Sequence, residues 1–104
     1  GGGDMGTAIG YVNQLRERAY GDASHNVSGL DLTSIFNERS REMYWEGTRR
    51  TDLIRFGFFT SGDYVWPWKG NEEYGVSVGE YRNLYPIPSA DIVANNNLVQ
   101  NPGY

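Results

Sequence analysis

The sequence predicts a mainly α-helical fold that carries long irregular, aromatic-rich loops. Two observations favour helices in the first half of the chain: apolar residues recur at three- and four-residue spacing, and glycines follow the ends of the periodic segments. A third observation sets the second half apart, since helical periodicity vanishes after Gly57. The length of 104 residues suits one small domain.

Composition and charge exclude several classes of protein. Nine Lys and Arg oppose 13 Asp and Glu, which gives a formal net charge of −4. This balance argues against a nucleic-acid partner and against a basic membrane-surface helix. The absence of cysteine excludes a disulfide framework, a thiolate nucleophile and a Cys-ligated metal. No apolar run approaches the roughly 18 residues that a bilayer-spanning helix needs.

The first helix is predicted over residues 5–19. The chain opens on three glycines without an initiator Met, which we interpret as a flexible linker or a cut end. Asp4 is a suitable N-cap, and Gly21 is the residue type that commonly ends a helix. One face carries the apolar residues Met5, Ala8, Ile9, Val12, Leu15 and Ala19.

Two further helices are predicted over residues 33–46 and 48–56, after a polar loop at 20–32. Asp31 or Thr33 can cap the first of them, and Gly47 interrupts it. Thr48 can cap the second, which Gly57 ends.

Residues 57–104 are predicted to be irregular. The prolines of Tyr-Pro-Ile-Pro at 85–88 force extended backbone, and Ser89 can cap one helical turn at 90–94. So long a structureless stretch is unusual in a compact domain, and two or three helices cannot bury eight tyrosines, four phenylalanines and three tryptophans. We therefore expect a piece of a larger protein that is unstable or self-associates when isolated.

Residues 38–55 hold many charges among apolar positions. Buried charges need partners, and the planar guanidinium of arginine suits carboxylates. We therefore predict a structural ion-pair network across Gly47. An alternative interpretation is a catalytic carboxylate pair, Glu42 and Glu46, of the kind used in glycoside hydrolysis. Neighbouring arginines argue against it, because they lower the pKa of a carboxyl that would need a raised one. The network would contain Arg39, Glu42, Glu46, Arg49, Arg50, Asp52 and Arg55.

Three runs of this sequence resemble the C-terminal signature of the SusD/RagB family. They are Asn-Glu-Arg-Ser-Arg-Glu-Met-Tyr-Trp-Glu-Gly-Thr-Arg-Arg-Thr-Asp-Leu-Ile-Arg-Phe-Gly at 37–57, Asn-Leu-Tyr-Pro-Ile-Pro at 83–88 and Asn-Leu-Val-Gln-Asn-Pro-Gly-Tyr at 97–104. Residues 11–19 resemble the helix that precedes this signature in the family. Asn96 departs from the pattern, because the family usually reads Asn-Pro-Asn-Leu there.

The resemblance implies a fold, a function and a place in the cell. It implies that residues 1–104 are the C-terminal segment of a SusD-like helical scaffold of tetratricopeptide-like helix pairs. It further implies a non-catalytic, surface-exposed outer-membrane lipoprotein of Bacteroidota that binds glycans or other nutrients. The implied partners are a SusC-type TonB-dependent transporter, an oligo- or polysaccharide and the N-terminal part of the same chain, whose upstream cysteine would carry the lipid. No cofactor is implied.

Five residues could contact a sugar: Tyr64, Trp66, Trp68, Lys69 and Asn71. Sugars stack their CH faces on aromatic rings and exchange hydrogen bonds with polar neighbours. Trp66 and Trp68 are two residues apart, so in extended backbone they would point the same way, and Pro67 would stiffen the segment. Two alternatives stay open: the indoles plug a hydrophobic surface of the larger protein, or the aromatic surface docks on a partner without contacting glycan.

Metal binding is not expected. His25 is the single histidine, and a zinc site without cysteine usually needs more than one. The loop oxygens of Asp22, Asn26 and Asp31 do not have the spacing of a calcium loop, so turn and cap roles are expected. The tyrosines Tyr81, Tyr85 and Tyr104 are expected to be packing residues.

Overall fold

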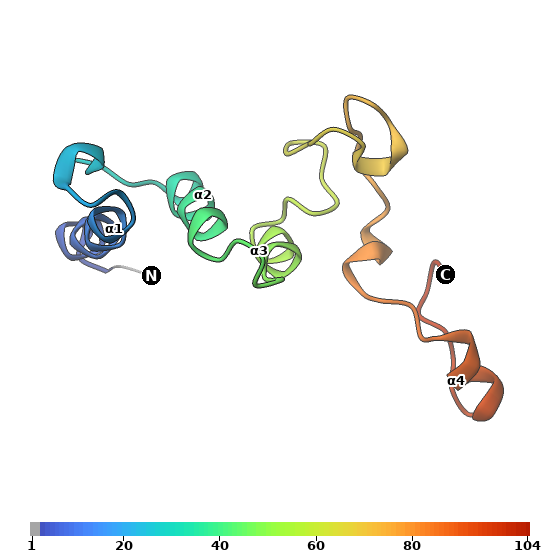
Figure 1. Ribbon diagram of the computed structural model, residues 1–104. Helices are drawn as coiled ribbons and strands as arrows, with labels where there is room; N and C mark the ends of the chain where they lie inside the picture. Colours follow the sequence, from blue (N-terminus) through green and yellow to red (C-terminus); the bar gives the residue numbers. More distant parts are fainter. Residues whose placement is uncertain (1–2) are drawn as a thin grey trace. The chain divides into compact units, whose positions relative to one another are not determined.

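A computed structural model describes residues 3–104 of the chain, which divides into two compact units, Gly1–Arg49 and Arg50–Tyr104. Figure 1 shows helices joined by irregular segments, and no strand occurs within residues 3–104. The predicted mainly α fold is therefore confirmed. None of the helices in this described part is both long and apolar enough to span a bilayer.

Unit 1 begins with helix α1 (Met5–Tyr20), whose ends are fixed by the predicted residues. The Asp4 carboxylate accepts a 2.7 Å hydrogen bond from the Thr7 N–H and a 2.6 Å bond from the Thr7 hydroxyl. Gly21 has φ 86° and ψ −7°, and its N–H donates to the Glu17 carbonyl. The helix predicted over residues 5–19 is confirmed and ends one residue later.

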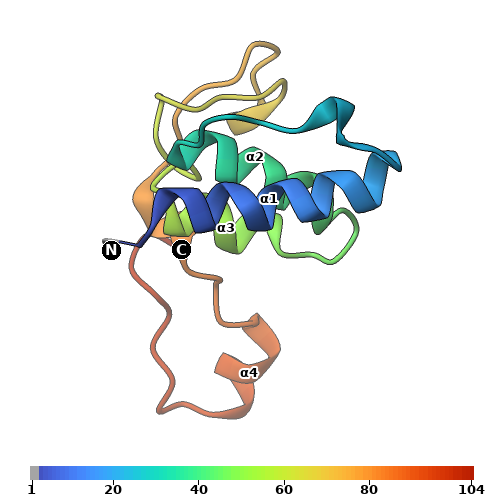
Figure 2. The ribbon, with the colours of Figure 1, turned by 90° about the vertical axis from the view of Figure 1, so that its left-hand side faces the viewer.

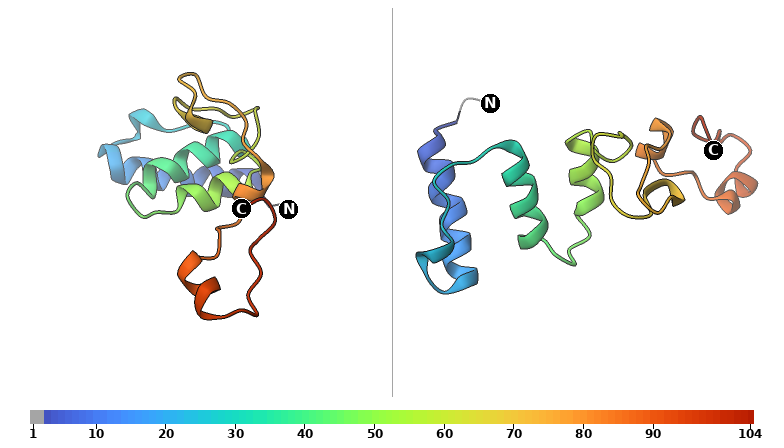
Figure 3. Two further views of the ribbon diagram at one scale, coloured as in Figure 1. Left: turned by 90° about the vertical axis from the view of Figure 1, so that its right-hand side faces the viewer. Right: turned by 90° about the horizontal axis from the view of Figure 1, so that it is seen from above.

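A return segment brings the chain back along α1 before helix α2 (Leu32–Glu42) begins. It contains the 3₁₀ turn η1 (Ala23–His25) and an extended stretch that Asn13 holds. The Asn13 side chain donates to the Val27 carbonyl at 3.0 Å and accepts from the Val27 N–H at 2.8 Å. Seen from above in Figure 3, α1 and α2 therefore run side by side in the same direction. The return segment connects the C-terminal end of α1 to the N-terminal end of α2. Figure 2 shows that this segment runs alongside α1 in the opposite direction.

Helix α2 is shorter than predicted. Asp31, rather than Thr33, is its N-cap and accepts a 2.6 Å bond from the Ser34 N–H. The helix ends at Glu42, so the prediction that it continues to residue 46 is wrong. The physical reason is that the backbone leaves helical geometry at Met43, with φ −99° and ψ 26°, and becomes left-handed at Trp45, with φ 69°, before Gly47 is reached. Glu46 therefore lies in the turn that follows the helix.

Helix α3 (Arg49–Arg55) begins at the end of unit 1 and continues into unit 2, one residue shorter at each end than the predicted 48–56. Gly57, with φ 73°, follows as predicted, and the N–H groups of Phe58 and Phe59 both donate to the Leu53 carbonyl. These bonds fold the chain back on α3 as it leaves the helix.

The rest of unit 2 is irregular, as predicted, apart from three short helical turns. They are η2 (Lys69–Asn71), η3 (Glu80–Asn83) and α4 (Ser89–Ala94). Ser89 is the first residue of α4 and does not cap it, because Pro88 holds the cap position and makes no side-chain hydrogen bond. The predicted turn at 90–94 is otherwise confirmed.

Side-chain amides and a phenol join the last residues of the chain to the proline-containing stretch before α4. The Gln100 side chain accepts from the Ile87 N–H at 2.8 Å and donates to the Ile87 carbonyl at 2.9 Å. Asn101 donates to the Tyr85 carbonyl, and the Tyr104 hydroxyl donates to the Leu84 carbonyl, both at 2.7 Å. The sequence runs at 83–88 and 97–104 are therefore in contact, and polar side chains of the second run hydrogen-bond to backbone groups of the first.

Hydrophobic burial is small in both units. Within residues 3–104 the buried hydrophobic side chains are Phe36 in unit 1 and Leu53 in unit 2. Large aromatic groups stay exposed, and Trp45 keeps 87% of its surface open. The expectation that these helices cannot bury the aromatic residues is thus confirmed.

Candidate functional site

Unit 2 contains a groove of about 460 Å³, which we call the aromatic groove. Three aromatic rings line it together with amide, hydroxyl and guanidinium groups, and its residues come from three separate stretches of the chain. The lining residues are Phe59, Trp66, Lys69, Gly70, Asn71, Ser77, Val78, Gly79, Tyr81 and Arg82.

Trp66 and Trp68 are separated by a tight turn, so the prediction that they point the same way from extended backbone is wrong. The Lys69 N–H donates to the Trp66 carbonyl at 3.0 Å, and Trp68 has φ 69° and ψ 6°. With Pro67 as the second residue, this is a type II turn, which needs a positive φ at its third residue. Trp66 lines the groove, whereas Trp68 does not line it and is 67% exposed.

Lys69, the single lysine of the chain, is buried. Its ammonium donates to the carbonyl oxygens of Phe58 (3.0 Å), Ser61 (2.5 Å) and Tyr64 (2.6 Å), and only 3% of the residue is exposed. Burial lowers the pKa of this ammonium, and the carboxylate of Asp63 opposes that shift. The three N–H groups are thus used within the protein, which leaves none to donate to a ligand.

The other two predicted residues take different places. Asn71 has φ 66°, is exposed and lines the groove. Tyr64 is half-buried: its ring stacks on Phe58 with centroids 5.0 Å apart and lies 6.3 Å from the Trp66 ring. The structure therefore brings Trp66, Lys69 and Asn71 together at the groove and places Tyr64 among the rings next to it.

Sequence reasoning missed three further residues that line the groove, Phe59, Tyr81 and Arg82. Tyr81 was expected to be a packing residue, and it does meet Tyr104 edge-on with centroids 4.9 Å apart. A Cβ on either Gly79 or Gly103 would lie 2.5 Å from a carbon of the Tyr81 ring, so both glycines are required for its position. Nothing in the linear sequence links residues 59, 66 and 81, because their proximity arises from the loop path.

The lining of the aromatic groove combines aromatic faces with hydrogen-bonding side chains. Rings offer apolar faces for the CH groups of a pyranose, while Asn71, Ser77 and Arg82 can hydrogen-bond to its hydroxyls. Its lining contains no carboxylate, so it holds no acid or base for glycosidic bond cleavage of the two-carboxylate kind.

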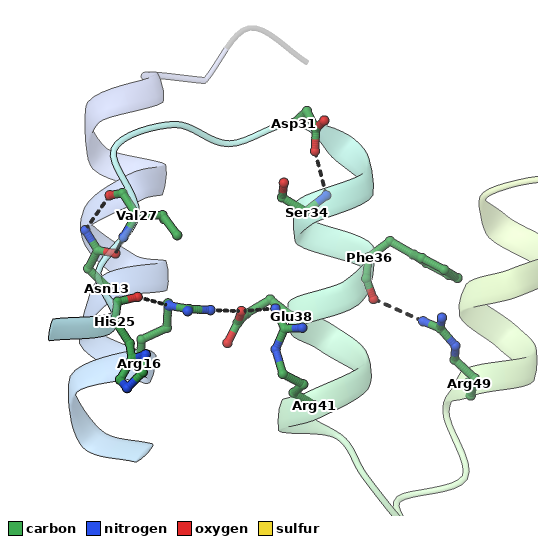
Figure 4. Close-up of polar contacts among 10 residues, drawn as sticks. All are labelled: Asn13, Arg16, His25, Val27, Asp31, Ser34, Phe36, Glu38, Arg41 and Arg49. Atoms are coloured by element: carbon green, nitrogen blue, oxygen red, sulfur yellow. Dashed lines mark hydrogen bonds and ion pairs between the residues drawn. The ribbon is translucent and has the colours of Figure 1, made fainter. Parts of the chain in front are cut away.

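Unit 1 contains the ionic contacts between α1 and α2, and Figure 4 shows those of Glu38. The Glu38 carboxylate accepts from Arg16 at 2.8 Å and from Arg41 at 2.6 Å, and Arg16 also donates to the His25 carbonyl. Partial burial acts to raise the pKa of Glu38, but the hydrogen bonds from Arg41 and Arg16 outweigh it and hold this pKa below its usual value. Sequence reasoning missed Arg16 and Glu38 because they lie on different helices.

The predicted network residues make contacts of three kinds. Each carboxylate oxygen of Glu42 accepts a hydrogen bond from Arg18 of α1, at 2.5 and 2.6 Å, while Arg55 lies 3.7 Å from the buried carboxylate of Asp52. Arg49 donates to the Phe36 carbonyl at 3.0 Å, and its guanidinium lies 3.6 Å from the Phe36 ring centroid (Figure 4). A single network through all seven predicted residues stays a prediction.

Arg50 binds backbone and aromatic rings of unit 2. Its guanidinium donates to the carbonyls of Arg82 at 2.8 Å and Asn83 at 3.2 Å. The same group lies 3.8 Å from the Tyr85 ring centroid and 4.8 Å from that of Phe59. Arg50 thereby fixes the backbone that carries Arg82 to the aromatic groove.

The carboxylate-pair hypothesis loses its geometric basis. It placed Glu42 and Glu46 one helical turn apart, but α2 ends at Glu42 and Glu46 is exposed in the following turn. Glu42 and Arg39 instead border a smaller groove of about 250 Å³ between α1 and α2, together with Val12, Leu15, Ile35, Glu38 and Met43.

The loop oxygens considered for a metal serve turns and caps. Asp22 accepts from the Ser24 N–H at 2.8 Å, and Asp31 caps α2. These hydrogen bonds, from Ser24 and Ser34, lower the pKa of the two carboxyls. His25 stacks on Tyr20 with ring centroids 4.0 Å apart. Residues 3–104 contain no group of three or more His, Cys, Asp or Glu side chains that could hold a metal ion.

Comparison with known proteins gives a consistent result. The SusD family model matches residues 1–104. The chain is 46% identical over 99 residues to starch-binding protein SusD of Bacteroides thetaiotaomicron, which covers 95% of the chain and 18% of that protein. It is 31% identical over 110 residues to SusD-like protein P25 of Formosa agariphila, covering 93% of the chain and 20% of that protein. The chain thus spans about a fifth of the length of these two relatives.

Proposed function

This chain belongs to the SusD family, and from that premise we propose that it is part of a non-catalytic glycan-binding protein of the bacterial outer-membrane surface. The observation that carries the proposal is the 46% identity to a starch-binding protein. The protein would be the C-terminal segment of a tetratricopeptide-like scaffold, held to the membrane by a lipid on an upstream cysteine. It would deliver oligo- or polysaccharide to a SusC-type TonB-dependent transporter.

Within this chain, we assign the ligand contact to the aromatic groove. Support comes from its three rings, its amide, hydroxyl and guanidinium groups, and its lack of a lining carboxylate. Trp66 and Asn71, two of the residues expected from the sequence, are retained in this proposal. Lys69 is assigned a structural place because its ammonium is fully bonded, and Trp68 lies outside the groove.

The test is glycan binding by the full-length protein that contains this chain. Affinity electrophoresis against starch, other α-glucans, β-glucans and uronate-containing polysaccharides should show retardation by at least one class. Trp66→Ala should then weaken retardation, whereas the neighbouring Trp68→Ala should leave it unchanged. Trp68→Ala is a matched control, because it removes an exposed indole two residues away that does not line the groove.

The results separate the alternatives. Release of reducing ends from any polysaccharide of the panel would contradict the non-catalytic assignment. If neither tryptophan variant affects glycan retention but the double variant weakens co-purification with the SusC-type transporter, this segment is a docking surface. Equal losses of glycan retention in the two variants would indicate that both indoles contact the sugar.

Membrane placement needs a separate experiment. We expect the full-length protein to label with radioactive palmitate, to fractionate with the outer membrane and to be removed from intact cells by external protease. A soluble periplasmic protein without lipid would contradict this part of the proposal while leaving glycan binding untouched.

A further inference from the structure

The loop that carries Trp66 and Asn71 is joined to its surroundings at Lys69. Three backbone carbonyls, those of Phe58, Ser61 and Tyr64, surround the Lys69 ammonium, and we call them the Lys69 cage. Three carbonyl oxygens need three N–H donors on one nitrogen, which among side chains only the protonated ammonium of lysine supplies. Three carbonyl groups of the backbone between residues 58 and 64 are therefore hydrogen-bonded to one cation.

The Lys69 backbone holds a second part of the loop. Its N–H donates to the Trp66 carbonyl at 3.0 Å, and its carbonyl accepts from the Val76 N–H at 3.0 Å. The loop closes tightly between these bonds, since a Cβ on Gly75 would lie 2.4 Å from the Trp66 carbonyl oxygen. Three stretches of backbone therefore meet at one residue.

The ammonium also contacts the groove ring itself. Its nitrogen lies 4.7 Å from the Trp66 ring centroid, a distance at which a cation is attracted to an indole face. Lys69 is 3% exposed and Trp66 is half-buried, so this contact lies at the protein side of the groove lining.

We propose that Lys69 is a positioning residue of the aromatic groove: its caged ammonium fixes the Trp66 indole so that one face is presented to a sugar ring. This inference rests on the proposed function for its ligand, and on the cage geometry alone for its effect on Trp66. The preorganised ring would bind without the cost of ordering the loop.

The test combines ring position with ligand affinity in the full-length protein. With 5-fluorotryptophan incorporated, the Trp66 ¹⁹F resonance is assigned by its disappearance in Trp66→Phe. We expect Lys69→Ala to shift and broaden this resonance and to weaken maltoheptaose binding, measured by calorimetry, by roughly tenfold through lost preorganisation.

Chemical rescue distinguishes positioning from general destabilisation. Propylammonium replaces the atoms that Lys69→Ala removes, and it can donate to all three carbonyls. Tetramethylammonium has the same charge but no N–H donor. Propylammonium should restore the Trp66 resonance and the affinity, and tetramethylammonium should restore neither. Equal rescue by both cations, or a Trp66 resonance in Lys69→Ala identical to that of the unchanged protein, would overturn the proposal.

A measurement on the unchanged protein covers the case in which Lys69→Ala fails to fold. Acetylation by an N-hydroxysuccinimide ester, followed by peptide mass spectrometry, should modify Lys69 slowly in buffer and rapidly in urea. Rapid acetylation in buffer would overturn the cage. If maltoheptaose does not bind the unchanged protein, starch recognition fails, whereas the ¹⁹F and acetylation results still decide the role of Lys69.

Discussion

The two units differ in how their cationic side chains join neighbouring elements. In unit 1, Arg16 and Arg18 of α1 bind the carboxylates of Glu38 and Glu42 on α2. In unit 2, Arg50 and Lys69 bind backbone carbonyls. Each unit also contains the other kind of contact, since Arg16 and Arg49 of unit 1 also bind carbonyls, and Arg55 of unit 2 lies near the Asp52 carboxylate. Unit 1 is built from two helices whose backbone groups are bonded internally, while most of unit 2 is irregular.

This difference follows from the requirement that buried backbone groups be hydrogen-bonded. A helix satisfies its own carbonyls, so its side chains are available to pair with side chains of a neighbour. A loop leaves carbonyls open, and a side chain with several donors can bond two or three of them at once. Arg16 and Arg18 thus join the helices of unit 1, whereas Arg50 and Lys69 close loops in unit 2.

The largest effect is expected from removing the ammonium of unit 2. Lys69→Met keeps most of the stem but leaves three carbonyls without their donor, at about 1–3 kcal/mol each when buried. We expect the stability of residues 58–76 to fall by about 3 kcal/mol or more, measured by amide hydrogen exchange in the full-length protein.

The control for this variant is Arg55→Met, which removes an exposed cation from the same unit. Its cost should be smaller than that of Lys69→Met, because the Arg55 side chain is 63% exposed and lies 3.7 Å from its partner, the buried Asp52 carboxylate. Similar losses from the two variants would mean that the carbonyl contacts of Lys69 add nothing beyond its charge.

Lys69 also shows where prediction from sequence stopped. Its type and the neighbouring aromatics suggested a ligand contact, but its partners Phe58, Ser61 and Tyr64 are brought to it by the loop path, which no periodic pattern encodes. The groove residues Phe59 and Tyr81 were missed for the same reason. By contrast, Asp4 and Gly21 fixed the ends of α1, because capping depends on residues close in sequence.

The end of α2 illustrates a second limit. The apolar and charged pattern continues to Glu46, and the glycine at 47 marked the expected stop. The helix ended earlier because the backbone leaves helical geometry at Met43 and is left-handed at Trp45, a conformation that non-glycine residues rarely adopt and that sequence alone does not signal. The mainly α fold class was predictable, whereas the exact turn was not.

The second-largest effect is expected from replacing Arg50, which binds carbonyls, with lysine. Arg50→Lys keeps the charge but loses the planar group that reaches two carbonyls and stacks on Tyr85. We expect a stability loss of about 2 kcal/mol in unit 2. In unit 1, Arg18→Lys should cost less than about 1 kcal/mol, because an ammonium can still pair with Glu42. Urea denaturation of both variants checks the contrast, and equal costs would contradict it.

A third effect concerns the loss of folding stability at low pH. The pKa of Glu38 in the folded protein is lowered from an ordinary value of 4.5. Its contribution to stability is therefore complete above about pH 4.5 and is lost as the pH falls through the lowered pKa. Glu38→Gln should cost about 1–3 kcal/mol at neutral pH and should remove this part of the acid dependence. Thermal melting from pH 7 to pH 3 compares the two proteins, and parallel curves would exclude Glu38 as the source.

The smallest effect is expected at Glu42, the carboxylate that also separates a structural role from a catalytic one. Its partner Arg18 is 64% exposed, and such pairs contribute about 0–1 kcal/mol. Glu42→Gln should therefore lower the melting temperature only slightly and leave glycan affinity unchanged. A catalytic carboxylate would behave differently: the unchanged protein would release reducing sugar from a polysaccharide, and Glu42→Gln would abolish that release without affecting the fold. Because Arg18 holds both oxygens of Glu42 and Glu46 lies outside the helix, we expect no such release from either protein.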